Sequence, residues 1–279
     1  MNDDDLLWQH LRELPAFRAL LRAVEGRFYQ DLLPLEGPVL DVGCGDGHFA
    51  SVALGGTAAP LAAGIDPSAG SLQEAQRRGA YRVLARAFGE ALPFADGAFA
   101  TVVSNSVLEH IPDLEPVLAE IARVLSAPEQ SKGQIGSSFR GRFIFCVPSD
   151  HFTELLLFPH LLRRLRLESL ARAYERYFNR ISRHHHCDGP DVWQARLARV
   201  GLELTDSFYY FSDRAHHALD LGHYLGVPNL VAKRLLGRWV LFPTRRNPVL
   251  ALTERWLRPL YEESLPPVGA YVFLVTKKA

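Results

Sequence analysis

The spacing of apolar residues changes along the chain, and each change predicts a different element. Between residues 36 and 150, short apolar runs that end in glycine or in polar residues predict strands. These runs occupy 37–43, 61–66, 81–85, 99–105 and 141–149. Two stretches between them have helical spacing, 68–78, which Gly79 ends, and 113–125, with Pro116 near its start. Alternating strands and helices predict a parallel sheet with a ligand at the carboxyl ends of its strands.

The segments on either side of this region are mostly helical. Helical spacing is found over 5–32, 151–182, 191–201 and 213–262, and strand patterns return over 202–212 and 269–278. The sequence therefore predicts an α/β fold with a doubly wound, mostly parallel, seven-stranded sheet. One helical insertion follows the fifth strand and a second precedes the last strand, and we expect the two to form a cap.

Composition narrows the class of protein without identifying it. Of the 279 residues, 48% are hydrophobic and 22% are charged, which is typical of a globular protein. No run of 18 apolar residues occurs and the N-terminus is acidic, so we expect a cytoplasmic protein without a spanning helix. The three cysteines are far apart, which argues against a disulfide framework and a zinc finger.

The first strand leads into a turn with three glycines, Gly43, Gly45 and Gly47. Glycine permits positive φ and lets a ligand approach the backbone closely. A tight turn without a ligand is the alternative interpretation. Asp66 ends the next strand, where a carboxylate accepts hydrogen bonds from two ribose hydroxyls, and Asp41 at the end of the first strand can face a cationic amine.

The order of these glycines disfavours a dinucleotide. A dinucleotide site uses G-x-G-x-x-G, whereas this chain has G-C-G-D-G, with the third glycine one place early. Asp46 would also direct a negative charge toward a phosphate. These features favour a ligand with a ribose and a cationic amine but no phosphate, a description that S-adenosylmethionine meets.

Four motifs in order, VLDVGCGDGHFA, GIDPS, EALPFADGAFATVVSNSVLEHI and GRFIFCVPS, resemble the class I, Rossmann-like S-adenosylmethionine-dependent methyltransferases. More narrowly, they resemble the type 11 group that includes the ubiquinone and menaquinone methyltransferases. The resemblance covers about 36–150, 189–211 and the final strand. It implies one methyltransferase domain with these parts: N-terminal helices 1–35, cofactor-binding core 36–150, insertion 151–188, core helix and strand 189–211, insertion 212–265 and last strand 266–279.

The resemblance also implies roles for residues of the cofactor site. The turn from Asp41 to Gly47 would hold the methionine part of the cofactor, Asp66 the ribose, and the segment before LPF the adenine. The backbone at Ser104 and Asn105 would bind the methionine group. The implied cofactor-binding residues are Asp41, Gly43, Cys44, Gly45, Gly47, Asp66, Pro67, Phe88, Gly89, Glu90, Ser104 and Asn105.

Two positions depart from the pattern of the family. Phe88 stands where an aspartate often binds the adenine amine, so ring stacking by Phe88 or a backbone bond at 89–91 would replace it. Ala100 stands where an aspartate usually begins the fourth strand, and we expect little consequence. The missing acid at Phe88 also leaves open an alternative function, a sensor or partner protein that binds S-adenosylmethionine without transferring its methyl group.

His110 is the candidate catalytic base. It follows the fourth strand at the cofactor edge of the sheet, and its ordinary pKa lies near neutrality. Alternatively, Glu109 and His110 only cap the helix that begins near Asp113. The loop with His184, His185, His186 and Cys187 is predicted to face solvent or substrate and to bind no metal, because adjacent histidines do not easily reach one tetrahedral centre.

Charge is distributed unevenly over the two halves of the chain. Residues 1–150 hold 12 Lys+Arg and 19 Asp+Glu, and residues 151–279 hold 19 and 12. The basic insertions favour a lid over a small-molecule or lipid-like acceptor, and peripheral membrane contact is the alternative. Nucleic acid is not expected as a partner, because the net charge is zero. The oligomeric state is undetermined by the sequence, as is the choice among O-, N- and C-methylation.

Overall fold

The computed structural model describes residues 5–55, 59–127 and 140–279. Its described residues group into two compact units, one from 1–31, 151–182 and 209–270, and one from 32–150, 183–208 and 271–279. The first unit thus contains most of the predicted N-terminal helices and insertions. Residues 128–139 of the predicted cofactor-binding core lie outside the described residues.

The second unit is built on a seven-stranded sheet with the order β3-β2-β1-β4-β5-β7-β6. Its strands are β1 Val39–Val42, β2 Leu61–Ile65, β3 Tyr81–Ala85, β4 Thr101–Asn105, β5 Arg142–Pro148, β6 Leu202–Tyr210 and β7 Tyr271–Lys278. β1 pairs in parallel with β2 and β4, and β7 is antiparallel to β5. The prediction of a doubly wound, mostly parallel sheet is confirmed.

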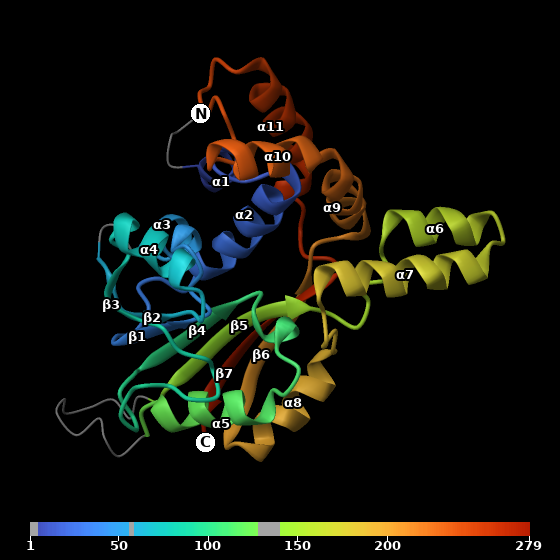
Figure 1. The fold of residues 1–279 in the computed structure, drawn as a ribbon. Coiled ribbons are helices and arrows are strands. Elements are labelled where there is room, and N and C mark those ends of the chain that lie inside the picture. Colours follow the sequence, from blue (N-terminus) through green and yellow to red (C-terminus); the bar gives the residue numbers. More distant parts are fainter. Residues whose placement is uncertain (1–4, 56–58, 128–139) are drawn as a thin grey trace. The chain divides into compact units, whose positions relative to one another are not determined.

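Helices cover both faces of this sheet (Figure 1). They are α3 His48–Ala53, α4 Ala69–Arg78, α5 Glu115–Val124 and α8 Pro190–Arg199. The Ser68 hydroxyl caps α4 by accepting a bond from the Ser71 N–H, and Gly79 ends the helix with φ +71°, as its sequence position predicts. α8 packs on β5 through the buried Trp193, whose ring centroid lies 5.0 Å from that of Phe145.

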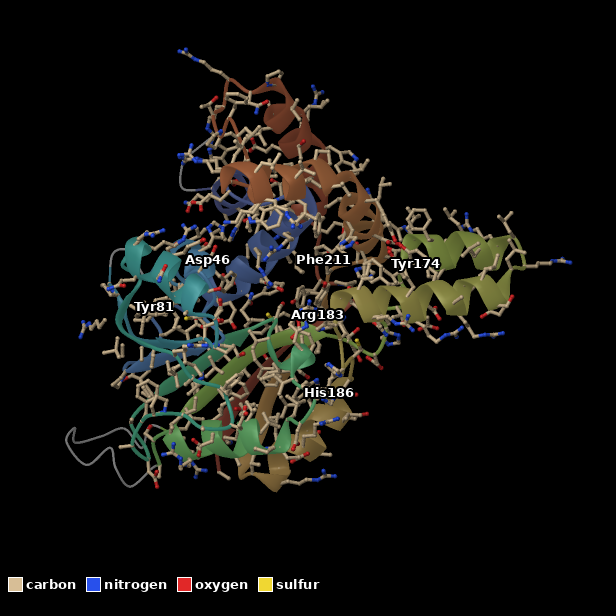
Figure 2. The ribbon with its side chains drawn as sticks, in the orientation of Figure 1. Asp46, Tyr81, Tyr174, Arg183, His186 and Phe211 are labelled. Carbon is tan, nitrogen blue, oxygen red and sulfur yellow. The ribbon has the colours of Figure 1, made fainter. Side chains whose placement is uncertain are left out.

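The first unit is helical, and partly buried polar contacts join some of its helices. Its helices are α1 Leu6–Leu11, α2 Ala16–Gln30, α6 Leu157–Arg164, α7 Glu168–Ser182, α9 Asp213–Leu225, α10 Val227–Leu236 and α11 Pro248–Tyr261. Arg258 of α11 donates two bonds, of 2.7 and 2.9 Å, to the Asp5 carboxylate at the start of α1. Tyr174 of α7, labelled in Figure 2, donates to the buried Asp220 of α9 at 2.5 Å. No helix in the described ranges has the length and apolar character needed to cross a membrane.

Candidate active site

A cleft of about 700 Å³ opens at the carboxyl ends of β1 and β2, within the second unit. Its volume is within the range of small-molecule sites. Seven of the predicted site residues line it: Gly43, Asp66, Pro67, Phe88, Gly89, Glu90 and His110. Segments that are far apart in the sequence thus meet at the edge of the sheet where ligands of such folds bind.

The glycine turn contributes Gly43 to the cleft wall, and its first two glycines differ in what surrounds them. Gly43 has φ +80°, and a Cβ there would lie 2.5 Å from a methyl carbon of Val107, so no larger residue fits. Gly45 has φ +54°, and a Cβ there would have no heavy atom within 4 Å. The backbone at Gly45 is therefore open to a ligand. Gly47 serves packing instead, because its Cβ would lie 3.2 Å from Ala75 of α4.

Asp66 connects the glycine turn to the next helix. Its carboxylate accepts a bond of 3.1 Å from the Gly45 N–H and one of 2.8 Å from the Ser68 N–H. Each oxygen retains acceptor capacity, since a carboxylate oxygen has two lone pairs. Asp66 lines the cleft, so these remaining lone pairs can accept hydroxyl donors from a bound ribose.

Asp41 lies deeper than the sequence suggests. Its side chain is buried and accepts a 2.6 Å hydrogen bond from the hydroxyl of Tyr81, which Figure 2 labels at the start of β3. Burial raises the pKa of Asp41 to about 6, the Tyr81 bond opposes this rise, and the charge of Asp66 adds to it. Sequence reasoning did not identify Tyr81 as the partner, because β3 is 40 residues further along the chain.

The segment after β3 supplies an aromatic surface to the cleft. The Phe88 side chain is 63% exposed although it is large and apolar, and it lines the cleft. Beside it, Gly89 packs against α5, where an added Cβ would lie 2.9 Å from a methyl carbon of Val117. An exposed ring on a fixed backbone is suited to stacking on a planar base.

Other predicted cofactor residues lie behind this surface. The Ser104 hydroxyl donates to the Val42 carbonyl at 3.0 Å, and the Asn105 side-chain oxygen accepts from the Cys146 thiol at 2.7 Å. Cys44 is buried, and burial raises the pKa of its thiol, which stays protonated. These side chains hold the ends of the strands in place, and the predicted backbone contacts of Ser104 and Asn105 with the methionine group stay predictions.

His110 lies on the short 3₁₀ turn η1, Leu108–His110, and lines the cleft with a side chain that is 45% exposed. Its Nδ1 is 3.2 Å from the carbonyl oxygen of Arg183, which precedes the histidine loop and is labelled in Figure 2. α5 begins only at Glu115, and its N-cap residue Leu114 forms no side-chain capping bond. The alternative interpretation of Glu109 and His110 as caps of this helix is therefore wrong.

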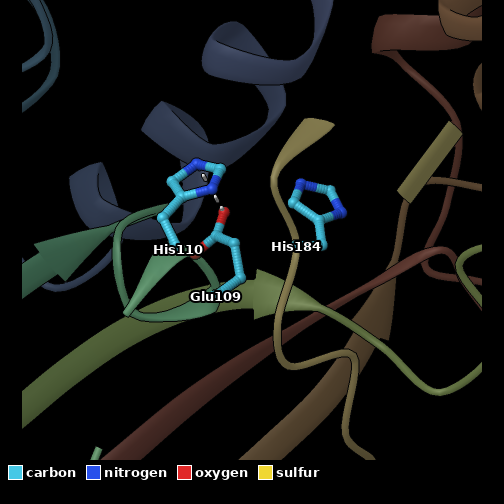
Figure 3. A group of neighbouring side chains, drawn as sticks. All are labelled: Glu109, His110 and His184. Atoms are coloured by element: carbon cyan, nitrogen blue, oxygen red, sulfur yellow. Dashed lines mark ion pairs between the residues drawn. The ribbon is translucent and has the colours of Figure 1, made fainter. Parts of the chain in front are cut away.

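A cluster of three side chains forms beside the cleft (Figure 3). The buried Glu109 has a carboxylate oxygen 3.9 Å from His110 Nε2, and potential ligand atoms of Glu109, His110 and His184 all lie within 4.8 Å of one another. Burial, followed by the charges of His110 and His185, lowers the pKa of His184 to about 3, so its ring is neutral at pH 7. Sequence reasoning considered the histidine loop alone and missed this cluster, because His184 is more than 70 residues from Glu109 and His110.

The fold of this chain is similar to the folds of solved methyltransferases. A possible histamine N-methyltransferase from Thermotoga maritima, described as S-adenosylmethionine-dependent, matches 95% of this chain and 91% of its own with a TM-score of 0.55 and 17% identity. Geranyl diphosphate C-methyltransferase from Streptomyces coelicolor, in complex with Mg²⁺, geranyl-S-thiolodiphosphate and S-adenosyl-L-homocysteine, matches 91% of this chain and 75% of its own with a TM-score of 0.54 and 13% identity. At 17% and 13% sequence identity, these two comparisons show a similar fold and do not identify a substrate for this chain.

Sequence comparison identifies the domain. Residues 40–127 match the methyltransferase domain family. An uncharacterized methyltransferase of Mycolicibacterium gilvum is 40% identical over 88 residues, which are 31% of this chain and 34% of that protein. The chain thus spans about a third of the length of this relative. Over residues 40–127, the chain is therefore similar to methyltransferase domains.

Proposed function

We propose that this protein is an enzyme that binds S-adenosylmethionine in the cleft and transfers its methyl group to a small-molecule or lipid-like acceptor. The observation that carries the proposal is the Asp66 carboxylate on the wall of a cleft of about 700 Å³, bonded to the N–H of Gly45, a glycine with open space at its Cβ position. This arrangement supports a nucleoside whose ribose is bound by Asp66. The match of residues 40–127 to a methyltransferase domain adds support from the sequence.

The surrounding residues give this nucleoside one orientation. We assign the adenine to the exposed face of Phe88 and the ribose hydroxyls to Asp66. The ammonium group of the methionine part is then placed toward the glycine turn, where the negative charges of Asp41 and Asp66 attract it. The sulfonium methyl group is left on the side of the cleft that His110 lines.

Methyl transfer asks little of the protein in acid catalysis, because a sulfonium is already a good leaving group. The nucleophile attacks the methyl carbon in line, the carbon–sulfur bond breaks, and its electron pair stays on sulfur. The contribution of the protein is to hold nucleophile and methyl group about 3 Å apart and away from water. We propose that His110 activates a hydroxyl acceptor at this position, and that the two helical insertions contribute to the choice of acceptor.

Two measurements on the purified protein test this function. Calorimetry with S-adenosyl-L-homocysteine and with NADH should give binding of the first and none of the second. A screen of isoprenoid, lipid-linked and small aromatic hydroxyl compounds should then give methyl transfer to at least one. Absence of binding of S-adenosyl-L-homocysteine refutes the proposal, whereas binding without transfer to any acceptor favours the sensor or partner protein.

Replacing Phe88 with alanine is expected to weaken binding of S-adenosyl-L-homocysteine about tenfold. Stacking of an aromatic side chain on a base contributes about 1–3 kcal/mol, and the high exposure of Phe88 places it at the lower end of this range. The thermal unfolding temperature should stay nearly unchanged for the same reason. Calorimetry measures the affinity, and Val83→Ala, which truncates an exposed side chain of β3, is the matched control. Equal affinities of F88A and the parent protein contradict the assignment of the adenine.

We further propose that an anionic lipid surface contacts the first unit over residues 225–256. Ten large hydrophobic side chains there are more than half exposed: Leu225, Val227, Leu230, Val231, Leu235, Leu236, Phe242, Val249, Leu252 and Trp256. α10 contributes no buried residue. From 233 to 258 the sequence has seven Lys+Arg and Glu254 as its single acid, so the charge is complementary to anionic headgroups.

The protein is expected to sediment with vesicles that contain an anionic phospholipid, and to do so more weakly with neutral vesicles and at high salt. The double change Leu235→Ser and Phe242→Ser should reduce this binding at least tenfold, since burying each of these side chains in the interface contributes more than 1 kcal/mol. Val83→Ser, an exposed apolar position in the second unit, should leave it unchanged. Equal binding by the double variant and the parent protein contradicts the proposed surface.

A further inference from the structure

We propose that Glu109, His110 and His184 form a binding site for one divalent transition metal ion of the zinc and iron(II) class. The set of ligand atoms is one carboxylate oxygen and two imidazole nitrogens, which first-row transition metals prefer and which Mg²⁺ and Ca²⁺ do not. Three protein ligands leave further coordination positions open, as in sites where the metal also binds a substrate.

The distances are close to those of a metal site. Ligand atoms about 2.1 Å from a tetrahedral ion are about 3.4 Å apart. The Glu109 oxygen and His110 Nε2 are 3.9 Å apart, and the whole set lies within 4.8 Å. Movements of less than about 1 Å per atom therefore bring the ligands to bonding distance, and the half-exposed His110 ring has room to rotate.

The protein also orients His110 in the manner of a metal ligand. A carbonyl oxygen only accepts, so the contact of His110 Nδ1 with the Arg183 carbonyl means that Nδ1 carries the proton. In the neutral ring, Nε2, the atom nearer Glu109, then carries the lone pair that a metal needs. Ring N–H donation to a backbone carbonyl is the usual second contact of metal-binding histidines.

Backbone contacts connect the two segments that supply the ligands. The His185 N–H donates to the Glu109 carbonyl at 2.7 Å, directly after His184 in the chain. The His186 ring lies 3.2 Å from the Pro112 carbonyl oxygen, beyond the turn that carries Glu109 and His110. The histidine loop is thus attached on both sides of the cluster, and the three ligands are held next to one another before a metal binds.

The position of His110 on the cleft wall gives the ion a function. With the ion bound, His110 Nε2 is a ligand, so the ion and not the imidazole activates the hydroxyl acceptor. A hydroxyl acceptor that binds to the ion loses its proton to solvent at a lower pH than it would in water. The resulting oxygen attacks the methyl carbon as the carbon–sulfur bond breaks, and neutral S-adenosylhomocysteine leaves. The role of the ion in methyl transfer rests on the proposed function. The binding of the ion by Glu109, His110 and His184 does not depend on that function.

The test uses the full-length protein without a polyhistidine tag, freed of metal by a chelator. Titration with Co²⁺ is expected to give one equivalent of bound ion with visible d–d absorption, and Zn²⁺ should displace it. His110→Ala, His184→Ala and Glu109→Gln should each weaken Co²⁺ binding about 100-fold or more, because even indirect partners of metal ligands contribute 10- to 100-fold. His185→Ala is the matched control, since it keeps the backbone N–H that binds Glu109.

Circular dichroism of each variant distinguishes lost ligands from lost folding, and His110→Ala, which truncates a half-exposed side chain, is expected to fold normally. The site is refuted if the parent protein binds Co²⁺ no more tightly than the folded His110→Ala variant. It is also refuted if His185→Ala weakens binding as much as His184→Ala, because the loop alone would then hold the ion. Binding of S-adenosyl-L-homocysteine to the same samples reports on the proposed function independently.

Discussion

Replacing Asp41 with asparagine is expected to stabilise the folded protein at pH 8 by up to about 3 kcal/mol and to weaken cofactor binding. Burial raises the pKa of Asp41 to about 6 from the ordinary value of 3.8. A tenfold change in proton affinity corresponds to about 1.4 kcal/mol, so keeping this carboxylate ionised in the folded state costs about 3 kcal/mol. Asparagine carries no charge and can still accept the hydrogen bond from Tyr81.

The size of the stability difference between D41N and the parent protein depends on pH between pH 3.8 and about 6. Below pH 3.8 Asp41 is protonated in both the folded and the unfolded protein, and its raised pKa contributes its full stabilisation. Between pH 3.8 and about 6 the folded protein keeps a proton that the unfolded chain has lost, so the free energy of unfolding falls as the pH rises. Above about pH 6 Asp41 is ionised in both states, and its contribution to the free energy of unfolding no longer changes with pH. The stability advantage of D41N should therefore grow from pH 4 to pH 7 and then remain constant.

Urea unfolding of the parent protein and of D41N at a series of pH values measures this difference. Tyr81→Phe is a control of opposite sign, because the Tyr81 hydroxyl lowers the pKa of Asp41 and its removal should destabilise the protein more at pH 8 than at pH 4. A stability difference between D41N and the parent that does not vary with pH contradicts the buried ionised state.

The cost of an ionised Asp41 is consistent with a role in binding. The ammonium group of S-adenosyl-L-homocysteine is positive, and its attraction to the carboxylate offsets the penalty of burial. Calorimetry should therefore show about tenfold weaker binding to D41N at pH 8, although the variant is more stable. This combination of higher stability and lower affinity distinguishes a functional acid from a structural one.

The elements of the sheet could be predicted from local sequence because each has a local cause. Strands β1, β2, β4, β5 and β7 are largely apolar runs, and α4 is set by the cap at Ser68 and by Gly79 with its positive φ. The glycine turn was equally predictable, since its conformation depends on residues adjacent in the chain. The cofactor side of the cleft followed, because parallel strands bring their carboxyl ends to one edge.

What sequence could not predict depends on contacts between distant segments. The Tyr81 hydroxyl meets Asp41 only because β3, β2 and β1 are adjacent in the sheet. His184 meets Glu109 and His110 because the backbone of 185 binds the Glu109 carbonyl, a contact that leaves no pattern in the sequence. In the sequence, His184, His185 and His186 therefore resemble an isolated histidine run. Their proximity to Glu109 and His110 is found only in the structure.

Replacing Gly45 with alanine is expected to weaken binding of S-adenosyl-L-homocysteine by about 100-fold and to reduce stability only slightly. The added methyl group would meet no protein atom within 4 Å. The expected loss of stability therefore comes only from the left-handed backbone at φ +54°, which costs about 1 kcal/mol for a residue with a Cβ. The space it occupies is the approach to the backbone that we assign to the cofactor. Overlap of that kind costs a further 1–3 kcal/mol in affinity.

Gly79→Ala is the matched control for this experiment. Gly79 also has positive φ, +71°, and open space around its Cβ position, but it caps the end of α4, whereas Gly45 donates to Asp66 of the cleft wall. The two variants should lose similar stability in thermal unfolding, and only G45A should lose affinity in calorimetry. If G45A and G79A bind S-adenosyl-L-homocysteine equally well, the ligand does not approach the turn at Gly45, and the proposed orientation of the cofactor is wrong.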